Sequence, residues 1–261
     1  MDDPLARLAA YYSEEAEIWE RRLAGLIHSL GLRLLERLPT DGARVVLDLG
    51  TGSGTLLPAI AAKAPRALVV GIDRAEGMVG RADPSFGRAV ADATRLPLAN
   101  ASVDAAMLAF MLFHLFDPDA GLREVHRALR AGGAVAVGTW TTAGPPANEV
   151  WAQTLDAHGA SPDLIPARHE LMDTPGKVEA LLRRAGFETI ATAVEREPDV
   201  MDPEEFLWRR TRVGPGGRRF RSLPEETRAA CLTAARERLA GLDPGDFTDP
   251  QEAVLAWAQK P

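Results

Sequence analysis

The stretch from Val45 to Ile60, V-V-L-D-L-G-T-G-S-G-T-L-L-P-A-I, decides the fold of this chain. An apolar run is followed by an acid, three glycines at alternate positions and an amphipathic segment, which predicts a buried strand, a tight turn and a helix. Because glycine has no Cβ, Gly50, Gly52 and Gly54 can adopt positive φ and let a ligand lie against the backbone. The following helix offers free N–H groups. The pattern therefore predicts a nucleotide-binding turn.

The spacing of these glycines separates two classes of ligand. A dinucleotide fingerprint has the form G-x-G-x-x-G, which places a pyrophosphate on the helix N-terminus. Here the pattern is D-x-G-x-G-x-G from Asp48, and Thr55 stands where the third fingerprint glycine is needed. This spacing disfavours NAD.

Acids also follow the next two predicted strands. The strand predicted over 67–72 ends at Asp73, where a carboxylate can accept hydrogen bonds from both ribose hydroxyls. The strand predicted over 86–91 ends at Asp92. A fourth strand begins after Ala101, and a helix with a glycine pair then leads into a fifth, so the pattern is that of an α/β fold.

As a set, these features resemble the class I S-adenosylmethionine (SAM) dependent methyltransferases. Within that class, the L-R-E-V-H-R-A-L-R-A-G-G segment at 122–133 resembles the ubiquinone/menaquinone C-methyltransferase-like branch, also called type 11. The resemblance covers roughly residues 45 to 140. It implies a Rossmann-like, seven-stranded, mostly parallel sheet with an antiparallel last strand, helices on both faces, and SAM as cofactor with S-adenosylhomocysteine as product.

The resemblance also assigns cofactor contacts. The glycine turn would hold the methionine portion, the acid after the second strand the ribose, the acid after the third strand the adenine, and the end of the fourth strand the methionyl amine. The residues implied are Asp48, Gly50, Thr51, Gly52, Gly54, Asp73, Arg74, Asp92, Ala93, Leu108 and Ala109.

His114, in M-L-F-H-L-F-D, is the candidate catalytic base. Methyl transfer from a sulfonium is an in-line displacement, which needs a positioned acceptor and a base only when the acceptor is poorly ionised. A histidine suits that proton transfer, whereas the alternative is a structural role in the loop. Quinone-type relatives often carry a histidine pair here, and Phe113 replaces its first member, which argues against a quinone substrate.

Apolar and aromatic residues suggest a hydrophobic acceptor pocket, with ordinary core packing as the alternative. The candidate substrate-binding residues are Tyr12, Trp19, Met111, Phe113, Trp140 and His169.

The chain divides into four predicted segments. They are 1–44 with covering helices, 45–140 with the cofactor-binding core, 141–175 as a substrate-recognition insertion, and 176–261, which completes the sheet. In the last segment, strands are predicted at 188–196 and at 252–258, the latter with alternating burial, and helices lie between them. The run G-P-G-G-R-R-F-R at 214–221 is predicted to be a solvated loop.

The composition of the chain narrows the classes of molecule that it is expected to bind. The chain has 261 residues, 46% of them hydrophobic, and a net charge of -7, which disfavours nucleic-acid binding. The base-methylating tetrapeptide N/D-P-P-Y/W is absent, and residues 109–111 read A-F-M, so a small molecule is the expected partner. A single cysteine, Cys231, excludes an internal disulfide, and no spacing predicts a metal site. We expect a cytoplasmic location, because no signal peptide or membrane span is recognisable. We also expect a monomer or a homodimer. The few lysines are typical of a GC-rich bacterial genome.

The expected function is therefore methyl transfer to oxygen, nitrogen or carbon of a small, largely apolar molecule in secondary metabolism. Three alternatives remain: a SAM-binding enzyme that catalyses a cyclisation or rearrangement, a noncatalytic SAM-binding protein, and an NAD oxidoreductase, which the glycine spacing disfavours.

Overall fold

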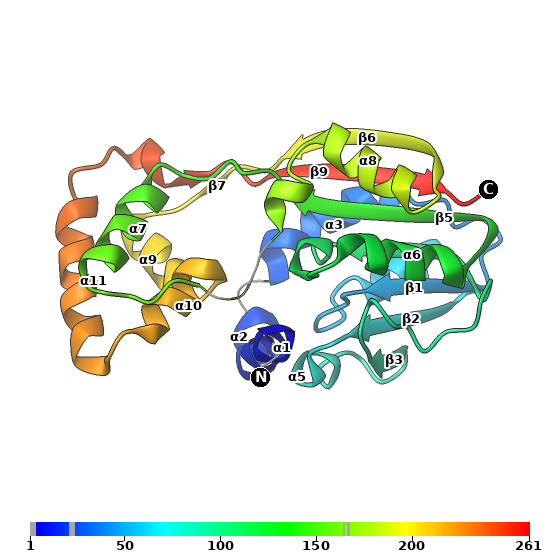
Figure 1. Cartoon of the computed structure of the whole chain (residues 1–261), viewed down its shortest axis with the longest axis horizontal. Helices are drawn as coiled ribbons and strands as arrows, with labels where there is room; N and C mark the ends of the chain where they lie inside the picture. Colours follow the sequence, from blue (N-terminus) through cyan, green and yellow to red (C-terminus); the bar gives the residue numbers. More distant parts are fainter. Residues whose placement is uncertain (1–3, 21–23, 164, 166–167) are drawn as a thin grey trace. The chain divides into compact units, whose positions relative to one another are not determined.

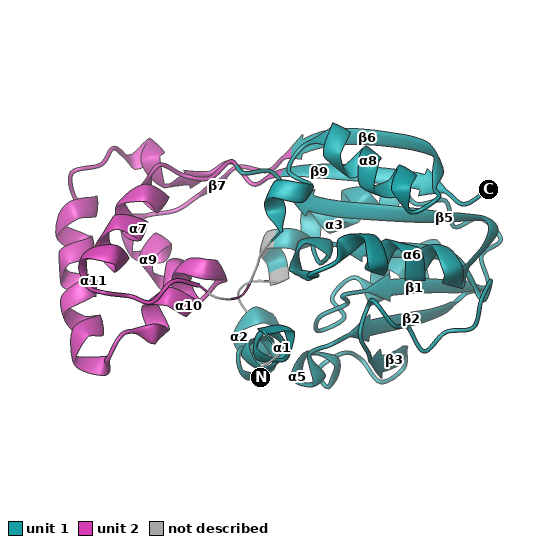
Figure 2. Ribbon diagram, viewed as in Figure 1, with its two compact units in different colours: residues 1–142, 166–195, 253–261 teal, residues 143–165, 196–252 magenta. Residues whose placement is uncertain are grey.

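The computed structural model describes residues 4–20, 24–163, 165 and 168–261, and Figure 1 shows the course of the chain. The chain forms two compact units, coloured separately in Figure 2. Unit 1 comprises residues 1–142, 166–195 and 253–261, and unit 2 comprises residues 143–165 and 196–252. The predicted insertion at 141–175 is thus divided between the two units, and most of unit 2 comes from the segment that follows it.

Unit 1 is built on a seven-stranded sheet with strand order β3-β2-β1-β4-β5-β9-β6. The pairs β1·β2, β1·β4, β2·β3 and β4·β5 are parallel, whereas β5 and β9 are antiparallel. This confirms the predicted fold class. The strands are β1 Val45–Leu49, β2 Leu68–Asp73, β3 Gly87–Val90, β4 Val103–Ala109, β5 Leu129–Trp140, β6 Glu188–Arg196 and β9 Glu252–Gln259.

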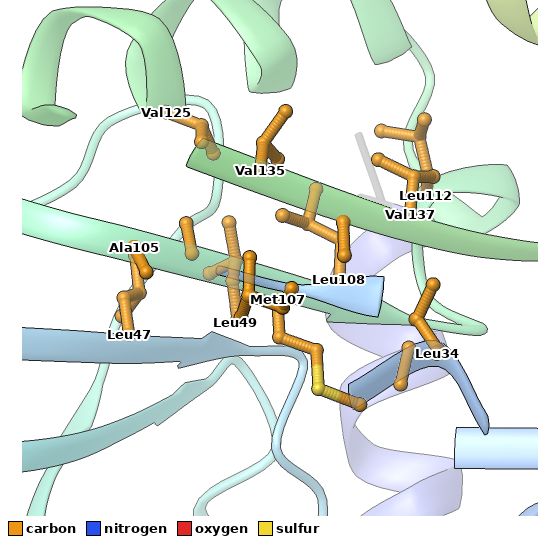
Figure 3. Packing of buried hydrophobic residues seen from close by; sticks show 14 of the residues in the cluster. Leu34, Leu47, Leu49, Ala105, Met107, Leu108, Leu112, Val125, Val135 and Val137 are labelled. Atoms are coloured by element: carbon orange, nitrogen blue, oxygen red, sulfur yellow. The ribbon is translucent and has the colours of Figure 1, made fainter. Parts of the chain in front are cut away.

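The central strands are nearly continuous apolar runs because both of their faces are covered. Figure 3 shows Leu47, Met107 and Val135 from three neighbouring strands packed into one core with Leu34, from a helix. Each of these side chains is at most 1% exposed. Because the core fixes these strands, it also fixes the loops at their carboxyl ends.

Short helices surround this sheet (Figure 1). The described residues of the N-terminal segment 1–44 form helices, and the glycine turn leads into a helix as expected. The helices of unit 1 are α1 Pro4–Glu14, α2 Ala16–Ile18, α3 Ala24–Arg37, α4 Leu57–Lys63, α5 Glu76–Val79, α6 Pro118–Ala128 and α8 Pro175–Arg184, with 3-10 turns η2 Leu112–His114 and η3 His169–Leu171.

The alternating burial predicted for 252–258 is wrong. Ala253, Val254, Leu255 and Ala256 are each 0% exposed. Successive side chains of a strand point to opposite faces, so both faces of β9 are covered, as in the other central strands of the sheet.

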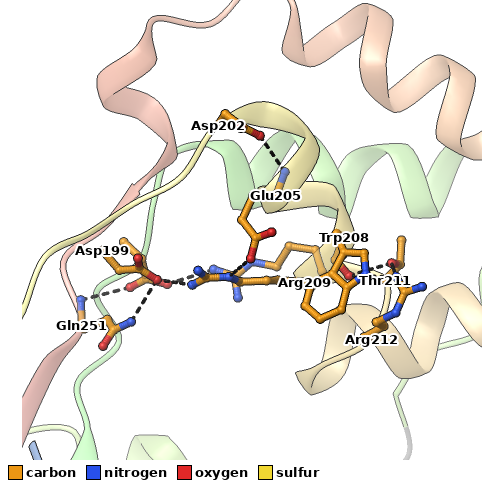
Figure 4. Close-up of polar contacts among 10 residues, drawn as sticks. Asp199, Asp202, Glu205, Trp208, Arg209, Thr211, Arg212 and Gln251 are labelled. Atoms are coloured by element: carbon orange, nitrogen blue, oxygen red, sulfur yellow. Dashed lines mark hydrogen bonds and ion pairs between the residues drawn. The ribbon is translucent and has the colours of Figure 1, made fainter. Parts of the chain in front are cut away.

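Unit 2 has a hydrophobic core of its own, which includes Trp151, Phe206 and Phe247. Figure 4 shows a polar cluster of this unit, in which Arg209 forms ion pairs with Asp199 and Glu205. Its elements are α7 Ala147–Ala157, α9 Pro203–Arg210, α10 Gly214–Ser222, α11 Glu225–Leu239, the 3-10 turn η4 Pro244–Phe247, and a two-stranded sheet of β7 Asp199–Val200 and β8 Thr248–Asp249.

The loop predicted at 214–221 is also wrong, because this segment forms α10. Phe220 is 8% exposed and packs near Trp151, with ring centroids 5.7 Å apart. Arg218 binds Asp163 through Nε, which donates to Oδ1 at 3.0 Å, and through Nη2. These contacts offset the low helix propensity of the glycines.

Within the described part of the chain, no helix combines the length and the apolar character needed to cross a bilayer.

Candidate cofactor and acceptor site

A cavity opens at the carboxyl ends of β1, β2 and β4, where the strand order reverses, which is the usual ligand position in such sheets. It encloses about 1050 Å³ of space, part of it open to solvent. The structure brings twelve of the predicted site residues to its wall: Tyr12, Trp19, Gly50, Thr51, Gly52, Asp73, Arg74, Asp92, Ala93, Ala109, Met111 and His114.

Six predicted residues do not line this cavity. They are Asp48, Gly54, Leu108, Phe113, Trp140 and His169. Three of them pack behind the wall: Phe113 stacks on His169 with ring centroids 4.1 Å apart, and Trp140 stacks on Phe110 at 4.3 Å.

Other wall residues were not predicted. Ser53 and Thr55 adjoin the glycine motif and could have been found by their position, whereas the N-terminal residues carry no local signal. The unpredicted residues are Leu5, Leu8, Ala9, Ile27, Leu49, Ser53, Thr55, Ala75, Met78, Ala91 and Leu115.

The glycine turn has the predicted left-handed backbone. The φ angles of Gly50, Gly52 and Gly54 are +75°, +56° and +77°. A Cβ added at Gly50 would lie 2.4 Å from Cβ of Met111, whereas one added at Gly52 would meet nothing within 4 Å. Gly50 therefore permits a close approach of two loops, and Gly52 leaves open space along the backbone.

Asp48 lies beneath the turn rather than in the cavity. Its side chain is buried, and Oδ2 accepts a hydrogen bond of 2.7 Å from Thr51 Oγ1. Burial raises the pKa of Asp48 to about 6, although the Thr51 bond opposes this and the nearby charge of Asp73 adds to it. Asp48 thus fixes the position of the Thr51 side chain within the glycine turn.

Asp73 ends β2 and holds the glycine turn. Its Oδ2 accepts from the N–H of Gly52 at 2.9 Å, and Oδ1 accepts from the N–H of Ala75 at 2.8 Å. Burial raises the pKa of Asp73, against the opposing effect of backbone hydrogen bonds from Ala75, Gly52 and Arg74. A carboxylate has about four acceptor positions, and backbone N–H groups occupy three of them, so Asp73 retains about one position for a ligand hydroxyl.

Asp92 follows β3 and is bound on both oxygens. Oδ1 accepts from N and Oγ1 of Thr94 at 2.9 and 2.8 Å, and Oδ2 faces Nη1 of Arg74 at 3.1 Å. Partial burial favours the neutral acid, but the Thr94 bonds and the charges of Arg74 and Arg95 together lower the pKa of Asp92. Asp92 is therefore ionised near neutral pH, and Arg74 joins the loops after β2 and β3.

Helix α1 brings aromatic residues to the other side of the cavity. Tyr12 Oη lies 3.2 Å from His114 Nε2, and the Tyr12 ring centroid lies 5.5 Å from that of Trp19. The helix is held against α5, where Ser13 Oγ accepts from Gly77 N at 3.1 Å. A Cβ at Gly77 would lie 2.7 Å from the carbonyl oxygen of Ser13, so this approach requires glycine.

Phe110 marks a strained point at the end of β4. Its φ is +56°, which is unusual for a residue with a large side chain, and its N–H donates to the carbonyl of Gly138 at 2.9 Å. This turn directs Met111 toward Gly50. Such strain occurs often at functional sites.

Comparison with known proteins identifies the family. A family model described as a methyltransferase domain matches residues 47–137. A malonyl-[acyl-carrier protein] O-methyltransferase from Dechloromonas aromatica is 30% identical over 198 residues, which cover 74% of this chain and 69% of that protein. The chain belongs to the SAM-dependent methyltransferases. The predicted family and the SAM cofactor are thereby confirmed.

Two further matches of this methyltransferase are partial. The ubiquinone/menaquinone biosynthesis C-methyltransferase of Syntrophotalea carbinolica is 36% identical over 113 residues, which cover 41% of this chain and 48% of that one. The solved phosphoethanolamine N-methyltransferase 2 of Haemonchus contortus, in complex with phosphomonomethylethanolamine and S-adenosylhomocysteine, matches with a TM-score of 0.54 and 20% identity. That match covers 89% of this chain and 52% of the other. At this identity the likeness shows the fold alone, and the chain spans about half of either protein.

Proposed function

We propose that this methyltransferase transfers the methyl group of SAM to oxygen, nitrogen or carbon of a small, largely apolar molecule, with His114 accepting the proton that the acceptor loses. The observation that carries this proposal is that the cavity holds both the nucleotide-binding turn and the contact between Tyr12 and His114.

The cofactor side fits SAM. Gly52 leaves backbone space for the methionine portion, and Asp73 has an acceptor position for a ribose hydroxyl. Asp92 and Ala93 would bound the adenine. When bound, SAM supplies an electrophilic methyl group on a sulfonium. A metal ion is not part of the proposal, and no group of three or more His, Cys, Asp or Glu among the described residues could hold one.

His114 and Tyr12 would handle the acceptor. A neutral imidazole has one donor and one acceptor nitrogen, so with Nε2 unprotonated it accepts from the hydroxyl of Tyr12. An acceptor hydroxyl that enters the cavity would compete for the same lone pair and lose its proton to it. Once Nε2 carries that proton it becomes a donor, and Tyr12 Oη would accept from it through the 3.2 Å contact and hold the ring in place.

Calorimetric titration with SAM and S-adenosylhomocysteine is the first test. We expect binding by the wild-type protein and at least about 100-fold weaker binding by Asp73→Ala, because a charge-assisted hydrogen bond to the ribose and the hydrogen bond that holds Gly52 are both lost. Asp83→Ala, which removes an acid outside the cavity wall, is the matched control.

Product mass completes the test. When an acceptor molecule has been identified, methylation adds the mass of one methyl group to it and releases S-adenosylhomocysteine. Product without added mass would instead indicate the rearranging alternative, and a folded protein that binds neither form of the cofactor would refute the proposal.

A further inference from the structure

Aromatic rings in contact with one another link His114 to His169. The ring centroid of Phe113 lies 4.4 Å from that of His114 and 4.1 Å from that of His169, and the planes of Phe113 and His169 differ by 28°. Phe113 is 5% exposed and does not line the cavity. His114 therefore contacts the ring of Tyr12, which lines the cavity, and the ring of Phe113, which lies behind its wall.

The segment that carries His169 also binds the main chain of Phe113. The N–H of Arg168 donates to the carbonyl oxygen of Phe113 at 2.7 Å. Two adjacent residues thus hold both the backbone and the ring of Phe113. This attachment matters because η2, which carries Phe113 and His114, is three residues long, and so short a 3-10 turn has few hydrogen bonds of its own.

The segment around His169 is itself fixed to the rest of unit 1. Nζ of Lys177, on α8, donates to the carbonyl oxygen of Glu170 at 2.8 Å and to Oδ1 of Asp173 at 2.6 Å. Met172 is 0% exposed and belongs to the main core. Burial lowers the pKa of His169, against the charges of Glu170 and Asp173, so its ring is neutral near pH 7. A neutral ring on a fixed segment is a suitable support for a stacked aromatic ring.

We propose that His169 is a positioning residue for His114, because its ring holds Phe113 and Phe113 holds the imidazole against Tyr12. A general base must lie within hydrogen-bond reach of the proton that it removes, and a small displacement of a reacting group slows the reaction strongly. This inference rests on the proposed function, since it concerns the base of the same site, but His169 itself does not line the cavity.

The ring signals of the histidines test this proposal without an acceptor. The chain has five histidines, and long-range ¹H–¹⁵N spectra of the free protein report the tautomer of each imidazole. The His114→Gln variant assigns the signals of His114. At pH 8 a histidine of ordinary pKa is neutral, and the contact with Tyr12 selects one tautomer. We expect the wild type to show one tautomer of His114 and a nuclear Overhauser effect (NOE) between the rings of His114 and Tyr12.

His169→Ala removes the ring that supports Phe113. We expect both tautomers of His114 to appear and its NOE to Tyr12 to be lost. His169→Phe keeps a flat ring and should retain the wild-type signals. A role confined to stability would lower the urea midpoint and leave His114 unchanged. Wild-type signals in the folded His169→Ala variant, or the same losses in His169→Phe, would overturn the inference.

His126→Ala is the matched control. The ring of His126 also packs against a phenylalanine of unit 1, Phe187, with centroids 5.1 Å apart, and it does not line the cavity. This variant should lower the urea midpoint and leave the signals of His114 unchanged, and altered signals would overturn the inference. If His169→Ala does not fold, Phe113→Leu breaks the same ring contacts and keeps an apolar side chain. We expect it to release His114, and wild-type signals would equally overturn the inference.

Failure of the inference and failure of the proposed function give different results. When an acceptor is known, kcat of His169→Ala should fall by about 10- to 100-fold, while the affinity for S-adenosylhomocysteine should stay within about twofold of the wild type. If His169→Ala releases the ring of His114 but His114→Gln methylates normally, the positioning stands and the role as base does not. If His114→Gln is inactive while His169→Ala leaves the ring in place, the proposed function stands and the positioning does not.

Discussion

The two sides of the cavity are constructed differently. The cofactor side consists of loops that directly follow β1, β2 and β3, and its acids are fixed by backbone N–H groups of nearby residues, such as Gly52 and Ala75 for Asp73. The acceptor wall, which is the cavity lining from the described residues of 5–27 and from residues 110–115, joins residues far apart in the chain, as the contact between Tyr12 and His114 shows. The cofactor side is therefore set by neighbouring strands of the sheet and the loops that follow them, whereas the acceptor wall depends on how α1 packs.

Because the two sides of the cavity are constructed differently, substitutions on one side should leave the function of the other side unchanged. The substitution with the largest expected effect is His114→Gln. Loss of the general base should lower kcat by about 10²- to 10⁴-fold for a hydroxyl acceptor. The affinity for S-adenosylhomocysteine should stay within about twofold of the wild type. Steady-state kinetics and calorimetry measure the two quantities, with His158→Gln as control. An unchanged kcat in the His114→Gln variant would show that His114 has a structural role and is not the general base.

Gly52→Val tests the opposite side. A valine would fill the space at the turn and would have to adopt a φ of +56°. We expect SAM affinity to fall by at least about 100-fold, and the free energy of unfolding to fall by about 1–2 kcal/mol. Calorimetry and urea denaturation separate these effects. Normal SAM binding by this variant would show that the cofactor does not lie against Gly52.

Gly50→Ala probes the place where the two sides meet. The new methyl group would overlap Met111, and φ at this position is +75°. We expect a loss of about 2–3 kcal/mol in unfolding free energy. The double variant Gly50→Ala, Met111→Gly should recover the part due to overlap. If the second substitution recovers nothing, the cost comes from the backbone alone.

Asp48→Asn has the smallest expected effect, and this effect is a change in how the stability of the cofactor side depends on pH. Since burial raises the pKa of Asp48 from 3.8 to about 6, the folded state retains a proton that the unfolded state releases, and stability falls as pH rises between these values. The wild type should therefore lose about 1 kcal/mol relative to Asp48→Asn between pH 5 and pH 7.5, as measured by urea unfolding. Parallel stability profiles for the two proteins would contradict this assignment.

The same contrast explains what could be predicted from the sequence. The strand that ends at Leu49, the positive φ of the glycines and the acid after β2 follow from short-range rules, and the structure places Asp73 at the cavity as expected. The assigned cofactor contacts stay predictions until binding is measured.

The acceptor wall was predicted less completely because its residues meet only through tertiary packing. Leu5 and Leu8 lie on a helix whose apolar pattern would equally suit ordinary core packing. Trp140 and His169 carry aromatic rings suited to a pocket, yet they pack behind the wall. The helix at 214–222 was missed for a similar reason, since the contacts of Phe220 outweigh glycine propensity.

The position of β9 has a consequence for the order in which the nascent chain can fold. Trp140 of β5 pairs with Ala253, and Ala134 pairs with Gln259, so β5 gains this neighbour only after all of unit 2 has been synthesised. Until then β5 presents an open edge, which is a site for wrong pairing with other chains. Unit 2 has its own core and can collapse earlier. Translation thus delivers the strand that joins β5 to β6 only after unit 2.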